Sequence, residues 1–286
     1  MMDIAQQKQD LIQQKGVWMV LGFFNCQKWL GILLVALVVA CMPLKAFYDN
    51  IQEKISPLVR NGIEAQQNEQ YQKAYEIFKQ AHEGGDVLGT ALLGSLYANG
   101  LGVRANPTKA KIYFNIVLKN DDLQKEVSRN RVQDHFKTDI FVPTYRSAAM
   151  IVANLGLAHL YEVGLGVEKS PKKAFKLYKL ILINMGANKG RNSGLALLVH
   201  TATLGLGGGL TQIALGNAFK LEKLPVAVLQ KLPFIKTLVA QTLYKMGMAY
   251  KMGVGVWRNR KKAKECFKMA LDLGSDPALE AMRDLQ

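Results

Sequence analysis

The chain has 286 residues and is 49% hydrophobic, which supports one or two folded domains and excludes wholesale disorder. Its 37 Lys and Arg outnumber its 22 Asp and Glu, and the formal net charge of +15 predicts a surface that attracts anions. The three cysteines, Cys26, Cys41 and Cys266, are too few and too scattered for a disulfide framework or a paired-cysteine zinc site.

The first predicted element is the apolar run Trp29–Leu44, which lies between Lys28 and Lys45. A helix of this length covers roughly 24 Å at about 1.5 Å per residue, less than a hydrocarbon core of roughly 30 Å. A signal peptide needs only about 7–15 apolar residues after a basic segment. Residues 1–45 are therefore predicted to be a signal or membrane-anchor segment.

The apolar run ends in a Val-Val-Ala-Cys sequence at Cys41, which resembles the lipobox of bacterial lipoproteins. The resemblance implies that Cys41 is lipidated and becomes the mature N-terminus. The segment before the apolar run is longer than in an ordinary signal peptide if translation starts at Met1, and of ordinary length if it starts at Met19. Both start sites therefore stay open. An uncleaved span that includes the apolar residues 17–26 is the main alternative, and a buried core helix is another. The first two interpretations place the chain in the bacterial cell envelope, with its bulk facing the periplasm.

Residues 46–69 are predicted to be a linker or a leading helix, and residues 70–286 to form a region of helical repeats that opens with the half-repeat Tyr71–Ala81. One ungapped motif then occurs three times: an aromatic residue, a Gly-x-Gly-Val loop, a polar residue and an alanine. The recurring residues are Tyr97, Gly100, Gly102, Asn106 and Ala110, then Tyr161, Gly164, Gly166, Ser170 and Ala174, and finally Tyr250, Gly253, Gly255, Asn259 and Ala263. A degenerate copy with Gly205 and Gly207 lies between the second and the third.

Each recurring residue type has a role in a helix–loop–helix unit. The glycines can adopt the left-handed conformation that ends the first helix. Asn or Ser can cap the second helix, and Pro107 and Pro171 fit its first position. The alanine allows close helix approach, and an aromatic residue four positions later fills the space between the helices. Because one unit cannot bury its apolar faces alone, the units are predicted to stack into an all-α solenoid.

The motif resembles that of the Sel1-like repeat family, which is related to the tetratricopeptide repeats. The resemblance covers about residues 70–274 and implies a helix-turn-helix repeat solenoid. It also implies a non-catalytic scaffold that holds partner proteins on its concave face, without a cofactor.

The copies are further apart than repeats of this family usually are, which predicts two insertions. In the first, at about 119–146, the helical spacing of Leu123, Val127, Val132 and Phe136 predicts an extra helix. In the second, at about 221–233, two prolines bound a short helix or loop.

No group of residues suited to catalysis or metal binding emerges from the sequence. The four histidines, His82, His135, His159 and His200, are isolated from one another and from other ligand types. No serine lies in a Gly-x-Ser-x-Gly elbow, and the glycine run 205–209 is not followed by Gly-Lys-Ser/Thr. The chain is therefore predicted not to be an enzyme and to need no metal.

A basic cluster at the start of one predicted helix is the first candidate binding site. This basic face comprises Arg258, Arg260, Lys261, Lys262 and Lys264, and a second group, Lys169, Lys172, Lys173, Lys176 and Lys179, occupies the corresponding place in an earlier repeat. Basic residues in a first turn oppose the helix dipole, so they do not serve helix stability. They fit an anionic surface, although a solvated outer face is the alternative. Nucleic acid is disfavoured, because the chain carries an export signal and no recognisable nucleic-acid-binding module.

The second candidate surface consists of the first helices of the repeats, predicted at 86–98, 147–163 and 236–252. Asn99, Glu162, His159 and Lys251 are its predicted contacts. The sequence thus favours an envelope-anchored scaffold that binds another protein. The alternative is an immunity protein that neutralises a delivered toxin such as a lipase.

Overall fold

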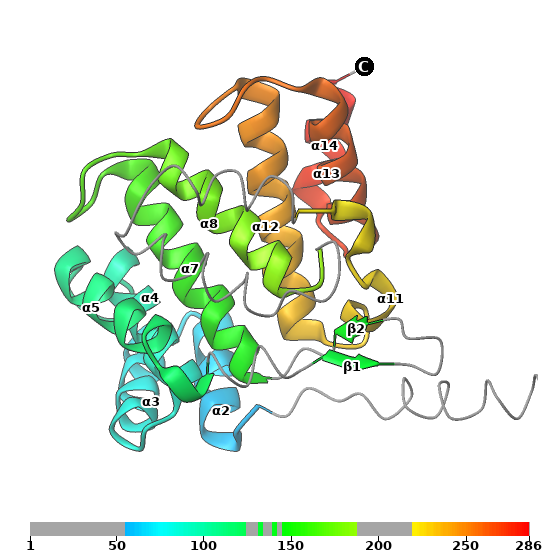
Figure 1. Cartoon of the computed structure of the whole chain (residues 1–286). Helices are drawn as coiled ribbons and strands as arrows, with labels where there is room; N and C mark the ends of the chain where they lie inside the picture. The colour runs from blue at the N-terminus through cyan, green and yellow to red at the C-terminus, as the bar shows by residue number, and fades with distance from the viewer. Residues whose placement is uncertain (1–54, 124–130, 134–138, 142–144, 188–218, 286) are drawn as a thin grey trace, which may run out of the picture. The chain divides into compact units, whose positions relative to one another are not determined.

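The computed structural model describes residues 55–123, 131–133, 139–141, 145–187 and 219–285 (Figure 1). The described residues all belong to one compact unit, Gln52–Gln286. The predicted signal or anchor segment and Cys41 lie outside the described residues. Within the described ranges, no helix combines the length and apolarity that a membrane crossing requires.

Ten α-helices account for most of the described residues. They are α2 Pro57–Gln67, α3 Tyr71–Glu83, α4 Val87–Asn99, α5 Pro107–Leu118, α7 Tyr145–Val163, α8 Pro171–Asn184, α11 Val226–Leu229, α12 Pro233–Met252, α13 Arg260–Asp272 and α14 Asp276–Arg283. A 3-10 helix, η1, spans Leu221–Lys223, and two short antiparallel strands, β1 Arg131–Gln133 and β2 Asp139–Phe141, pair with each other. The prediction of an all-α repeat fold is confirmed, with this strand pair as an addition.

The helices form four successive hairpins, α2–α3, α4–α5, α7–α8 and α12–α13. Each new hairpin packs on the one before it: α4 contacts α3, α7 contacts α4 and α5, and α12 contacts α7 and α8 (Figure 1). Helix α14 packs against α12 and α13 at the end of the stack. Neighbouring hairpins thus bury one another's apolar faces, as in other helical repeat arrays.

The loop between the two helices of each motif closes in the same way three times. The first glycine takes a positive φ, for example +68° at Gly100, where α4 ends. The backbone N–H of the capping residue donates to the carbonyl of the recurring tyrosine, at 2.8 Å from Asn106 to Tyr97 and 2.9 Å from Asn259 to Tyr250. The Asn106 side chain then accepts from the backbone of the next helix at 2.9 Å. Ser170 caps α8 in the corresponding way. The loop is therefore determined by contacts within the motif.

The second glycine of each loop lies against the preceding hairpin. A Cβ on Gly102 would collide with the backbone of Tyr71, at the start of α3. A Cβ on Gly255 would collide in the same way with Pro171, at the start of α8. A Cβ on Gly166 would lie 3.0 Å from the Cβ of Pro107, at the start of α5. The absence of a side chain at this glycine thus lets consecutive repeats approach closely.

A lysine and the recurring tyrosine join the two helices of each motif. The lysine precedes the recurring alanine, and its ammonium lies over the tyrosine ring in all three copies. The distances to the ring centroid are 5.3 Å for Lys109 over Tyr97, 5.3 Å for Lys173 over Tyr161 and 5.6 Å for Lys262 over Tyr250. Such cation–π contacts are favourable, so these three lysines have a role within the repeat.

Aromatic residues of the second helices fill the core opposite glycines of the first helices. Phe114 is completely buried, and a Cβ on Gly94 would lie 2.8 Å from its ring. The same ring also touches Gly156 of α7, in the next hairpin. In the last hairpin, a Cβ on Gly247 would lie 2.5 Å from the ring of Phe267. Because glycine has no side chain, the helices can approach closely enough to enclose each ring.

The prediction of an extra helix over the insertion at 119–146 is wrong at Val132. Residues 121–123 are helical, with the Asn120 side chain accepting from the Leu123 backbone at 2.8 Å. Val132, however, lies in β1 opposite Ile140 of β2. A few apolar residues at helical spacing cannot distinguish a helix from a strand, and a β-branched residue such as Val132 has a high propensity for strands. Val127 and Phe136 lie outside the described residues.

The degenerate copy around Gly205 and Gly207 also lies outside the described residues. The hairpins on either side of it in sequence, α7–α8 and α12–α13, are in direct contact through Gly255 and Pro171. The insertion at 221–233 contains η1 and the short helix α11 and ends at Pro233, the first residue of α12.

Candidate functional site

A groove of about 580 Å³ runs along the first helices of the hairpins. Its walls come from α2, α4, α7 and α12, with Tyr178 of α8 at one side. Asn99, His159 and Glu162, three of the four predicted contacts, line this groove. Lys251, the fourth, does not line the groove, and its ammonium pairs with Asp284 at the end of α14 at 2.9 Å.

The groove combines apolar and amide side chains with one ion pair. Leu155 and Leu238 supply apolar surface, while Asn99 and Gln241 supply amides that can both donate and accept. Glu162 of α7 and Lys245 of α12 pair across the groove at 3.3 Å. These groups suit contact with a polypeptide, which presents apolar side chains together with backbone donors and acceptors.

Tyr178 stays protonated at one side of the groove. Burial raises the pKa of its phenol well above the ordinary value, and the charge of Glu162 and a hydrogen bond to it raise the pKa further. A phenol in this state can donate a hydrogen bond, but it cannot act as a base near neutral pH.

The histidines do not assemble a site in the part of the chain that the structure describes. The Nδ1 atom of His82 lies 3.0 Å from the Thr90 hydroxyl, and its ring meets the edge of Tyr113. His159 lies alone in the groove, and His135 and His200 fall outside the described ranges. Among the described residues, no three His, Cys, Asp or Glu side chains come close enough to hold a metal ion.

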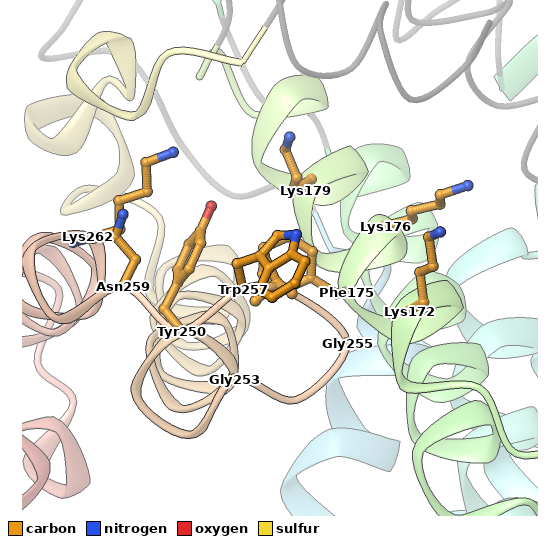
Figure 2. A pocket seen from close by; sticks show the side chains of 11 residues that line it. Lys172, Phe175, Lys176, Lys179, Tyr250, Gly253, Gly255, Trp257, Asn259 and Lys262 are labelled. Atoms are coloured by element: carbon orange, nitrogen blue, oxygen red, sulfur yellow. Dashed lines mark hydrogen bonds between the residues drawn. The ribbon is translucent and has the colours of Figure 1, made fainter. Parts of the chain in front are cut away.

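The basic face is divided by the structure. Lys262 lines a second hollow of about 640 Å³ together with Lys172, Lys176 and Lys179 of α8; we call this hollow the basic cavity (Figure 2). Arg260 instead donates to the carbonyl of Leu285 at 3.1 Å. Arg258, Lys261 and Lys264 are exposed and do not line the cavity, and neither do Lys169 and Lys173.

The described residues leave the positive charge of the basic cavity without a neighbouring carboxylate. Among the described residues, no carboxylate lies within 4.0 Å of the four cavity lysines. Burial and the charge of Lys262 lower the pKa of Lys179 to about 8. Burial, with Lys172 and Lys173 adding to it, also lowers the pKa of Lys176. An anion in the cavity would therefore offset two unfavourable effects on the charged lysines, the cost of their desolvation and their mutual repulsion.

Sequence reasoning missed the aromatic walls of this cavity, which are Phe175, Tyr250 and Trp257. Tyr250 had been assigned only a role in the repeat. A signal for Trp257 exists, because the corresponding loop position is Arg104 in the first copy and Glu168 in the second. An aromatic residue in a position otherwise occupied by charges marks this loop as different.

Comparison with known proteins identifies the repeats. The Sel1 repeat model matches residues 88–116, 151–181 and 240–275, which correspond to the hairpins α4–α5, α7–α8 and α12–α13. No curated protein is significantly similar in sequence to this chain.

Two solved structures are among those similar to this chain. One is a Sel1 repeat protein from Oxalobacter formigenes, with 17% identity and a TM-score of 0.29, where the match covers 80% of this chain and 87% of the other. The second is a protective antigen present in uropathogenic Escherichia coli strains, displaying an SLR fold, with 18% identity and a TM-score of 0.22. The match covers 80% of this chain and 56% of that antigen, so the chain spans about half of the antigen's length.

Proposed function

Because three Sel1 repeats make this chain a Sel1-like repeat protein, we propose that it is a non-catalytic scaffold of the bacterial envelope that holds a partner protein in the groove. Sel1 repeats generally mediate protein–protein interaction and form a scaffold without catalytic function. The observation that carries the proposal is the groove itself, because the first helices of all four hairpins contribute to one continuous lining.

A photo-crosslinking amino acid placed in the groove tests this function in cells. We expect a discrete crosslinked product from position 99 or 241, because Asn99 and Gln241 are exposed residues of the groove. Position 264 is the matched control, since Lys264 is also exposed and lies on α13, outside the groove. The product is detected on a denaturing gel and identified by mass spectrometry.

A second variant links the product to the groove surface. Asn99→Arg combined with Gln241→Arg should abolish crosslinking from a probe at position 95, because Ser95 lines the same groove. The helix content by circular dichroism should stay unchanged. Equal products from positions 99, 241 and 264 would contradict the groove as the binding surface.

Envelope attachment is the second part of the proposal, and it rests on the apolar run before Cys41. Incorporation of a fatty-acid probe into the wild type, lost in Cys41→Ser, is the expected result for a lipoprotein. Cys26→Ser is the matched control and should keep the label. Membrane attachment of the wild type without any label would replace the lipoprotein by an uncleaved span.

Toxin neutralisation, the alternative function, would use the same groove. It predicts that the crosslinked partner is a toxin and that cells lacking this protein are killed by that toxin. Identification of the partner therefore distinguishes a structural scaffold from an immunity protein.

A further inference from the structure

We propose that the basic cavity binds an extended acidic segment of the partner protein, with its carboxylates on the lysines of α8 and an apolar or aromatic side chain on Trp257. This inference rests on the proposed function, because it takes a protein as the partner. It adds a second contact, on α8 and the loop before α13, to the contact in the groove.

The lysines of the cavity form a row along one helix. Lys172, Lys176 and Lys179 lie at positions i, i+4 and i+7 of α8, so successive Cα atoms are separated by about 6 Å and about 4.5 Å along the helix axis. Alternate side chains of an extended peptide point the same way about 6.6 Å apart. The row therefore matches several separated carboxylates better than one compact anion.

The row is specific to this repeat and is not a property of the repeat motif. The corresponding residues of α5 are Thr108, Ile112 and Asn115, which carry no charge. Those of α13 include Glu265 in the middle of the row. Because the fold is maintained in those hairpins without three lysines, stacking of the repeats does not require the row.

Two of the three aromatic residues of the cavity, Phe175 and Trp257, depart from the repeat motif as well. Phe175 stands where the other two copies have Lys111 and Lys264. Its ring meets that of Tyr250 edge to face, with the centroids 5.1 Å apart, and both side chains are buried. They form a fixed apolar wall beside the lysines, which suits a ligand that carries apolar as well as charged groups.

Trp257 stands at the mouth of the cavity with 92% of its surface exposed. In Figure 2 its indole lies between Tyr250 on one side and the lysines of α8 on the other. An indole this exposed gains little from the fold of its own chain, whereas covering it with a ligand removes a large apolar area from water. Its position allows it to cover a peptide side chain while the lysines hold the neighbouring carboxylates.

Lysine is suited to this ligand, and Lys262 has an additional role. An ammonium is a point charge that can donate hydrogen bonds to carboxylates in several directions, without the fixed fork of an arginine. Lys262 also lies over Tyr250, as Lys109 and Lys173 lie over their own tyrosines, so changing it would disturb the repeat. The test therefore uses Lys172 and Lys176, for which no such contact exists in the described part of the chain.

The probe is a fluorescein-labelled nine-residue peptide with Glu at positions 1, 3, 7 and 9 and Phe at position 5, so that all five side chains lie on one face of the extended peptide, and it is added to the full chain. We expect saturable binding by fluorescence anisotropy and a loss of affinity as salt rises, because exposed charges are screened within about 8 Å at physiological ionic strength. A peptide with Gln in place of Glu should not bind. A peptide with Ser in place of Phe should bind about fivefold more weakly, because it lacks the side chain that covers the indole.

Two double variants with the same loss of charge form the critical comparison. Lys172→Gln with Lys176→Gln should weaken binding about tenfold, the usual scale for removing close charge pairs. Lys261→Gln with Lys264→Gln removes two exposed lysines outside the cavity and should change the affinity less than about twofold. Trp257→Ala should weaken binding about fivefold and Trp257→Phe should restore most of it. Circular dichroism checks that every variant keeps its helix content.

Several outcomes would overturn the proposal. They are no binding of the Glu peptide, equal losses in the two double variants, or displacement of the peptide by pyrophosphate or ATP at lower concentration than by unlabelled peptide. Wild-type binding to phosphatidylglycerol vesicles that exceeds peptide binding and needs Lys172 and Lys176 would assign the cavity to a membrane instead. Crosslinking from positions 99 and 241 is measured separately, so the scaffold function can stand when the acidic segment fails.

Discussion

Phe114→Ala should lower the free energy of unfolding by about 3–5 kcal/mol, the usual cost of removing a fully buried aromatic ring. The Phe114 ring is completely buried and contacts Gly94 of its own hairpin and Gly156 of the next. The cavity left by the substitution would therefore lie where two repeats meet, and the glycines have no side chains to fill it. Urea denaturation of the full chain, followed by circular dichroism, measures the loss.

Ile112→Ala is the matched control for this substitution. Ile112 lies on the same helix, α5, but is 54% exposed, so its truncation should cost less than about 1 kcal/mol. Similar losses for the two variants would show that Phe114 does not hold the two hairpins together.

Gly102→Ala should destabilise the chain by about 2–4 kcal/mol, because two costs add. The positive φ of +67° costs a side chain about 1–2 kcal/mol, and the new Cβ would collide with the backbone of Tyr71. The loop would have to move away from the preceding hairpin. The change in unfolding free energy, measured with urea, gives the size of the effect.

Gly85→Ala separates the two costs. Gly85 has a φ of +80°, and a Cβ on it would meet nothing within 4 Å, so only the conformational cost of about 1–2 kcal/mol applies. If both alanine variants lose the same stability, the second glycine of the motif serves the turn alone and not the contact between repeats.

Structure within each motif could be predicted from sequence, because its causes are local. The glycine that ends α4, the Asn106 cap and the first position of α5 act on backbone groups a few residues away. The same holds for α7–α8 and α12–α13, and the three motifs lead to the correct family and to an all-α repeat fold. The strand at Val132 was missed because its hydrogen-bonded partner, around Ile140, is not visible in a local apolar pattern.

The sequence by itself determined the loops, the caps and the predicted first helices that line the groove, because these depend on residue types within one motif. Only the tertiary structure decided which faces meet. In the folded chain Lys262 lines one cavity with the lysines of α8, whereas Lys261 and Lys264 do not line it. Lys251 pairs with Asp284. The tertiary structure also revealed that the second glycines touch the preceding repeat. Such contacts join residues far apart in the chain, and they depend on how closely the helices of successive hairpins pack.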